Sequence, residues 1–325
     1  MGDDAHDRQT HLRCEAWVRA RAGDPAEGIF GPDSLAWTLV REPAYLLGGA
    51  AAVLLQMAHP AVVAGVSAHS TFETDLLGRI RRTSQALYSL VFGHLDDALA
   101  TSRRMHNIHT RVRGTVDHPC SSWHGRPYRA NDPELLAWVS MTATVAGRRA
   151  FEAFVRPIAP HELAGDWNDL CRGAVASGVD PEGLPPSREA FFARFEAIAE
   201  DSPDLEVGPK ARAVARVLFG APLGVFDPVI TAALLPPRVR AMYDLPWGPA
   251  EMRAFARRRS VFAALRTMAP EAVRYVPAWH QARRRLAVRD GASGALWGRV
   301  LDAMSARMAV PAGLRVSALK QNGRG

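Results

Sequence analysis

The stretch that decides the fold covers residues 44–72 and reads AYLLGGAAAVLLQMAHPAVVAGVSAHSTF. It contains no Asp, Glu, Lys or Arg, and it is long enough for a membrane-spanning helix. Alanines and glycines interrupt the apolar run, however, and Pro60 disfavours a helical conformation at His59. We therefore predict two segments buried in the core of a soluble protein rather than one transmembrane span.

The rest of the 325-residue chain also shows the patterning of helices. Its 48% hydrophobic and 22% charged residues exclude a disordered chain, a collagen-like chain and a coiled coil. No run alternates with period two for long, and no shift in composition marks a domain boundary. We predict one large all-α domain with a polar, peripheral segment at residues 1–27 and a loop-rich segment at 115–131. Helices are expected at 34–41, 44–58, 61–69, 75–93, 96–113, 133–155, 160–176, 187–200, 208–219, 226–234, 249–267 and 292–308.

The formal net charge is +7, and Lys210 and Lys320 are the only lysines among 40 basic residues. One interpretation of this arginine excess is codon usage, and the other is a basic surface for nucleic acid or anionic lipid. The runs at 257–259 and 283–285 lack interleaved aromatic residues, which nucleic-acid surfaces commonly have. We interpret them as solvated helix faces or carboxylate partners, and we expect no nucleic-acid partner.

Three cysteines, Cys14, Cys120 and Cys171, are widely and irregularly spaced. This spacing predicts neither a metal-binding pair nor a disulfide framework. The sequence starts MGDDAHDRQTH, without the basic and apolar regions of a signal peptide. A cytoplasmic protein is therefore expected.

The segment 96–113 has the features of an amphipathic helix. Asp96 or Asp97 can cap its start, and Gly114 suits the position just past its end. Spacings of three and four residues define an apolar stripe, which should face the core. The stripe consists of Ala98, Ser102, Met105, His109 and Val112.

His109 is therefore predicted to point inward, with His106 on the flank of the stripe. One interpretation is a core histidine that is hydrogen-bonded to a neighbouring carbonyl. The other is an axial ligand to a haem iron or another metal ion.

The preceding helix, expected at 75–93, also places a charge on an apolar face. Its inner face consists of Arg79, Thr83, Leu87 and Leu90, and Arg82 adjoins it. A guanidinium on such a face needs an anionic partner. Glu73 or Asp75 could form an internal ion pair, or a ligand could supply a propionate or phosphate. A cavity between the two helices would suit such a ligand.

A third cluster contains Gln56, His59 and His69 among apolar residues. Two histidines ten residues apart across a proline make a poor metal motif. We interpret His59 mainly as a hydrogen-bonding residue at a helix break, with a pocket residue as the alternative. Phosphate loops, GxSxG, HExxH, CxxC and paired ExxH motifs are absent from the sequence.

Several segments together resemble the DUF2236 family, the catalytic domain shared by the MpaB-type oxygenase and the latex clearing protein, a rubber oxygenase. Their order and spacing agree with the family from about residue 28 to residue 287. The segments are LLGGAAAVLLQMAHPAVVAGVSAHSTF (46–72), GRIRRT (78–83), VFGHLDDA (91–98), HTRVRG (109–114), GRPYRANDPELLAWVSMT (125–142) and LLPPRVRAMYDLPW (234–247).

The resemblance implies an all-α fold that encloses a haem b over residues 28–287. It leaves outside a polar N-terminal extension at 1–27 and a C-terminal helix and tail at 288–325. It assigns His109 as the iron ligand, and it matches Arg79 and Thr83 to an Arg-x-x-x-Thr element. Arg82 stands where the rubber oxygenase has a lysine that can occupy the distal side of the iron. Arginine does not readily deprotonate, so this ligation is not expected here. Arg82 instead joins His109, Arg79 and Thr83 as a cofactor-binding candidate.

One departure from the family concerns the base. The rubber oxygenase carries a glutamate about sixteen residues before the arginine, and the corresponding residues 60–64 contain no carboxylate. The nearest replacements are His59, His69 and Glu73. Our catalytic candidates are therefore Arg79 and Thr83, with His59 and His69.

The resemblance and the two helices favour a haem b-dependent oxygenase that uses dioxygen on an apolar, unsaturated or isoprenoid-like small molecule. The alternative is a haem- or lipid-binding helical protein without turnover, which the missing glutamate motivates. A basic nucleic-acid or membrane-surface protein is a third hypothesis, which rests on charge alone. Contact with a membrane surface stays open, as does the oligomeric state.

Overall fold

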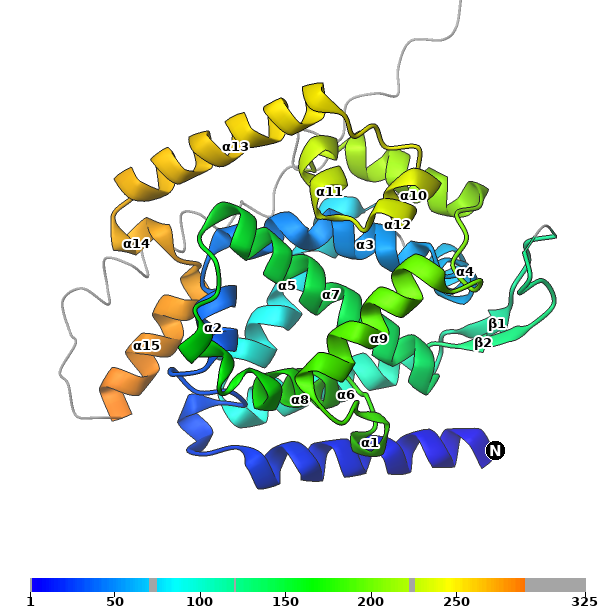
Figure 1. Ribbon diagram of the computed structural model, residues 1–325. Helices are drawn as coiled ribbons and strands as arrows, with labels where there is room; N and C mark the ends of the chain where they lie inside the picture. Colours follow the sequence, from blue (N-terminus) through cyan, green and yellow to red (C-terminus); the bar gives the residue numbers. More distant parts are fainter. Residues whose placement is uncertain (1, 70–74, 120, 222–225, 290–325) are drawn as a thin grey trace, which may run out of the picture.

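The computed structural model describes residues 2–69, 75–119, 121–221 and 226–289. Nearly all of its elements are helices (Figure 1), and this confirms the predicted all-α class. The helix expected at 292–308 lies outside the described residues.

Helix α7 (Pro133–Phe154) lies in the middle of the molecule (Figure 1). Asp132 caps its start by accepting hydrogen bonds from the backbone N–H groups of Glu134 and Leu135. The apolar stretch packs against α7 as the 3₁₀ helix η2 (Pro43–Gly48) and helix α3 (Gly49–Met57). The centre of the core is therefore built from the segment that the sequence singles out.

The chain turns sharply between α3 and α4 (Pro60–His69). The two segments on either side of this break are bent by 106°. The His59 ring accepts a hydrogen bond from the Ala61 backbone N–H through Nδ1, at 3.3 Å. This confirms the break at Pro60 and the hydrogen-bonding role of His59. Within the described residues no single helix is long and apolar enough to cross a membrane, and this bent pair passes that test only when its two segments are taken together.

Helices α5 (Leu76–Phe92) and α6 (Leu95–His109) form an antiparallel hairpin. The hydroxyl oxygens of Ser89 and Thr101 lie 2.8 Å apart across it. The cap of α6 differs from the prediction, because the His94 ring, rather than Asp96 or Asp97, accepts from a first-turn N–H.

The end of α6 also differs from the prediction. The helix ends at His109 because the chain then enters strand β1 (Arg113–Thr115), which pairs antiparallel with β2 (Pro127–Arg129). Gly114 therefore pairs with Tyr128 and does not cap the helix. The loop-rich segment that we expected at 115–131 contains this small hairpin.

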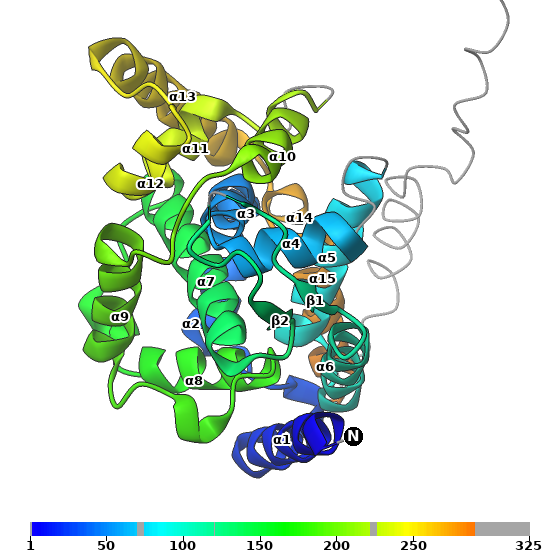
Figure 2. The ribbon, with the colours of Figure 1, turned by 90° about the vertical axis from the view of Figure 1, so that its right-hand side faces the viewer.

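The N-terminal segment, expected to be peripheral, forms the long helix α1 (Gly2–Arg21). It lies along α6 and α8 (Figure 2). Its residues Cys14 and Val18 are buried in a cluster with Leu95, Leu99 and Val175. At the other end of the described chain, α15 (Pro277–Arg289) packs on α5.

The remaining helices surround this core. Half of them begin at a proline, which lacks the N–H that a first helical turn leaves unpaired. They are α2 (Leu35–Val40), α8 (Asp166–Ala176), α9 (Arg188–Asp201), α10 (Pro209–Phe219), α11 (Pro228–Leu234), α12 (Pro237–Met242), α13 (Pro249–Met268) and α14 (Glu271–Arg274). Cys171 on α8 is buried, as Cys14 is.

Candidate functional site

The inner face of α6 carries His109. The members of the predicted stripe are all buried or half-buried, whereas Arg104, Asn107 and Ile108 on the other side of the helix are exposed. Burial lowers the pKa of His109, and the nearby His106 lowers it further. His109 therefore presents a neutral imidazole at neutral pH, with a nitrogen lone pair available for a ligand.

Arg79 on α5 is half-buried. Burial lowers its pKa, and the positive charge of Arg82 adds to this effect. Because α5 and α6 run antiparallel, Arg79 near the start of α5 lies toward the same end of the hairpin as His109. The structure thus brings these two predicted residues to one end of one hairpin.

Arg82 and Thr83 differ from the prediction. The Arg82 guanidinium is exposed and forms an ion pair with Asp75 at 2.9 Å. The side chain of Thr83 is exposed as well. The physical reason lies in the neighbours of α5, because α2 and α15 pack against its second half, around Val91 and Phe92. Among the described residues, the side chains of its first half are exposed or half-buried.

His59 and His69, the other catalytic candidates, hold local structure. The His59 ring is buried and packs edge-to-face against Trp123, with ring centroids 4.8 Å apart. Burial lowers its pKa to about 4. His69 is exposed, and its Nε2 lies 3.3 Å from the carbonyl oxygen of Arg113 in β1. The contacts that the structure gives these two rings are with α4, β1 and the loop between the strands.

An apolar cavity of about 140 Å³ lies between α2, α5, α7 and α8. Ala143 belongs to its wall and is exposed, although it stands in the middle of the central helix. Five further residues of the cavity wall are small or apolar, and they lie on one face of α5 or one face of α7. They are Leu87, Leu90, Val91, Ser140 and Thr144.

Sequence reasoning missed one titratable group in this cavity. Asp169 on α8 contributes to the wall and accepts a hydrogen bond from the Ala36 backbone N–H at 3.0 Å. Burial raises the pKa of its carboxyl to about 6. Nearby, Arg148 is neutralised by Asp166 at 2.6 Å. No spacing along the chain marks Asp169, because α8 is far from the other site residues in sequence.

The described residues contain no group of three or more His, Cys, Asp or Glu side chains that could hold a metal ion. A bare ion therefore has no preformed protein cage in this part of the chain. A single inward imidazole could instead serve as the one protein ligand of a metal ion whose other ligands belong to a cofactor. The fold and site together define an all-α protein with a half-buried imidazole on the inner face of one helix hairpin and an apolar cavity between neighbouring helices.

Comparison with known proteins makes the assignment more specific. The chain belongs to the family of the ER-bound oxygenase mpaB/B' and rubber oxygenase catalytic domain, which matches residues 37–267. The family is one of oxygenases, which are oxidoreductases. The match ends before α15 and begins after α1, so these two packed helices lie outside it.

Two curated relatives come from mycobacteria. They are the uncharacterized proteins Mb2261 of Mycobacterium bovis and Rv2237 of Mycobacterium tuberculosis. Each is 29% identical to this chain over 217 residues, which are 63% of this chain and 82% of the relative. No solved structure shows a significant match to this chain.

Proposed function

We propose that this protein is a haem b-dependent oxygenase that uses dioxygen on an apolar substrate, with His109 as the protein ligand to the iron. The observation that carries the proposal is the neutral, inward-facing His109 at one end of the α5–α6 hairpin, in a chain of an oxygenase family. An apolar cavity lies against the other end of α5. A haem, when bound, supplies the chemistry that activates dioxygen.

The donor set of the described residues fits this group. A haem iron takes four ligands from its macrocycle and needs one neutral imidazole from the protein. The structure shows no hydrogen bond to the His109 ring from the described residues, so its nitrogens are available. The described residues contain no cluster of His, Cys, Asp or Glu side chains that could hold a metal ion without a cofactor.

The other residues of the chain would position and shield the group. Arg79 would offset the negative charge of a propionate from its half-buried position on α5. Arg82 is a weaker candidate for this role because Asp75 already neutralises it. Thr83, His59 and His69 stay candidates whose contacts do not reach the inner face of α6.

The apolar cavity supports an apolar substrate, and we propose the unsaturated or isoprenoid-like class. Leu87, Leu90 and Val91 of α5 would exclude water from it, and Ala143 leaves room on the opposite wall. Asp169 provides the one carboxyl in this wall with a raised pKa, and it could hold or release a proton near neutral pH.

An absorption spectrum tests the proposal. The purified or haem-reconstituted protein should show a Soret band, and His109→Ala should lose or severely perturb it. His161→Ala serves as the control, because His161 is an exposed histidine between α7 and α8 and its loss should leave the band unchanged. A protein that stays colourless after reconstitution would contradict the proposal.

A second candidate is a haem- or lipid-binding protein without turnover. The observation that favours it is the apolar composition of the first turn of α4, where Pro60, Ala61, Val63 and Ala64 are buried and no carboxylate occurs. Oxygen consumption with a panel of unsaturated lipids separates the two candidates, since a pure binder consumes none.

A further inference from the structure

We propose that the groove between α1 and α6 binds a phosphate-bearing ligand. The groove lies on the outer side of α6, opposite the face that carries His109. Its lining includes Arg8 and Leu12 from α1, and Arg103, Asn107 and Arg111 from α6 and the turn after it. It is a site distinct from the apolar cavity, and it requires no haem.

Positive charge dominates this groove. Arg8, Arg103, Arg111 and Arg113 contribute to its lining, and none of the described residues that line it carries a carboxylate. Arg103 is held by Glu15 at 2.7 Å, so its charge is already offset. Arg8 and Arg111 are exposed, and the structure shows no ion pair for either within the described residues. Guanidinium groups bind phosphate oxygens in a bidentate manner, so the groove suits a phosphate better than it suits a neutral ligand.

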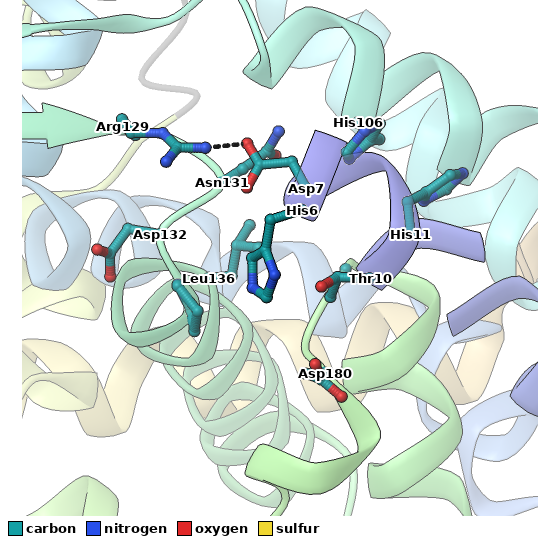
Figure 3. Close-up of a pocket in the computed structure, with 12 residues that line it drawn as sticks. His6, Asp7, Thr10, His11, His106, Arg129, Asn131, Asp132, Leu136 and Asp180 are labelled. Carbon is teal, nitrogen blue, oxygen red and sulfur yellow. Dashed lines mark hydrogen bonds and ion pairs between the residues drawn. The ribbon is translucent and has the colours of Figure 1, made fainter. Parts of the chain in front are cut away.

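The base of the groove provides a second, independent observation. The rings of His11 and His106 stack there at a centroid distance of 4.4 Å (Figure 3). His11 is only 8% exposed, and neither of its ring nitrogens has a hydrogen-bond partner among the described residues. A buried polar side chain without a partner is unusual and calls for a missing one. A phosphate oxygen at the base of the groove would supply the acceptor.

The other side of this histidine pair is a different environment. The pocket of Figure 3 contains carboxylates that are already engaged. Asp7 pairs with Arg129, Asp180 pairs with Arg13, and Asp132 caps α7. These carboxylates disfavour an anion there, so the observations assign the anion to the arginine-lined side.

The spacing of the groove residues separates the two functions of α6. Arg103, Asn107 and Arg111 recur every four residues, so they form one stripe along the helix and its final turn. His109 belongs to the opposite stripe. One helix therefore presents the proposed iron ligand inward and a cationic surface outward. Helix α1 lies outside the family match, so the groove is not implied by membership of that family.

Isothermal titration of the full-length protein with inorganic pyrophosphate tests the site. Pyrophosphate should bind, with an affinity that decreases as salt is added. Arg111→Gln should weaken this binding about tenfold, as expected for the loss of one charge-assisted pair. Arg111→Lys keeps the charge and loses the planar guanidinium, so its affinity for pyrophosphate should lie between those of the wild type and Arg111→Gln. Arg257→Gln on α13 is the matched control, because it removes an exposed arginine elsewhere and should change nothing.

Vesicles distinguish the source of the phosphate. If phosphatidic acid vesicles bind and Arg111→Gln weakens that binding, a lipid headgroup is the ligand. If pyrophosphate alone binds, the ligand is a soluble phosphate compound. The proposal is overturned if neither probe binds, or if Arg257→Gln costs as much affinity as Arg111→Gln. It is also overturned if polyglutamate binds more tightly than pyrophosphate with the same dependence on Arg111, which would indicate an acidic protein partner.

Discussion

At the scale of single residues, two histidines of this chain show what a sequence pattern can and cannot assign. The spacing around His109 predicts an inward ring, and the ring is half-buried on the inner face of α6. The proline after His59 predicts a break, and the ring caps the helix that follows. Arg82 shows the limit, because spacing identifies a helix face but does not say which neighbours cover it. Only the tertiary structure shows Asp75 as its partner.

The buried His59 predicts a pH dependence of stability. Its pKa is about 4 in the folded protein and 6.5 in a solvated histidine, so the unfolded chain binds the proton more readily between these values. The free energy of unfolding should therefore decrease as the pH falls below about 6.5, and by at most about 3 kcal/mol for this group once the pH is below about 4.

Urea denaturation at several pH values measures this effect. His59→Asn removes the titrating ring while keeping a side-chain oxygen that can accept from Ala61. Other buried histidines titrate in both proteins, so the difference between the two pH profiles isolates His59. Parallel profiles for the wild type and His59→Asn would contradict the prediction.

At the scale of elements, most helices follow from apolar periodicity, and a proline begins seven of the fifteen α-helices in the described residues. The β1–β2 hairpin was not predicted, because three-residue strands are too short for a period-two pattern to show. The end of α6 was misplaced for the same reason, since the helical pattern runs on into residues that pair as a strand. The last packed helix, α15, was missed too, because its arginines at 283–285 obscure the buried Trp279, Ala282 and Leu286.

The crossing of η2 and α7 predicts a difference between two adjacent glycines. A Cβ atom at Gly48 would lie 2.3 Å from the carbonyl oxygen of Ala146, which is backbone of the central helix. Gly48→Ala should therefore lower the free energy of unfolding by about 2–3 kcal/mol. Chemical denaturation measures the change.

Gly49 supplies the control for this substitution. Nothing lies within 4 Å of a Cβ atom built there, and its backbone is helical. Gly49→Ala should be neutral, or stabilise by up to about 1 kcal/mol through helix propensity. Equal effects of the two substitutions would show that the close crossing does not exist in solution.

At the scale of the whole molecule, segments from both ends of the described chain pack onto the central core. The polar composition of residues 1–27 suggested a peripheral segment, because the buried residues of α1 are few among many charges. Cys14 and Val18 lie four residues apart and form a narrow stripe, which composition alone does not reveal. The sequence did not predict the position of the cavity either, because its wall comes from four helices that are distant in sequence.

The attachment of α1 predicts a stability effect on the whole molecule. Val18 is 1% exposed, so Val18→Asp would bury a carboxylate among Leu95, Leu99 and Val175. The free energy of unfolding should fall by about 3 kcal/mol or more. Ala20→Asp adds the same group at an exposed position of the same helix. It should change the free energy of unfolding by less than about 0.5 kcal/mol. A comparable melting temperature for the two variants would show that α1 is not part of the folded core.

The burial of Cys14 and Cys171 has a chemical consequence for an oxygenase-family protein. Burial raises the pKa of Cys14 to about 12 and that of Cys171 to about 11. At neutral pH the thiolate, which is the form that oxidants attack, then amounts to about one molecule in 10⁵ for Cys14 and one in 10⁴ for Cys171. Both thiols should therefore react slowly with oxidants, including those that dioxygen chemistry releases, and stay in the reduced form.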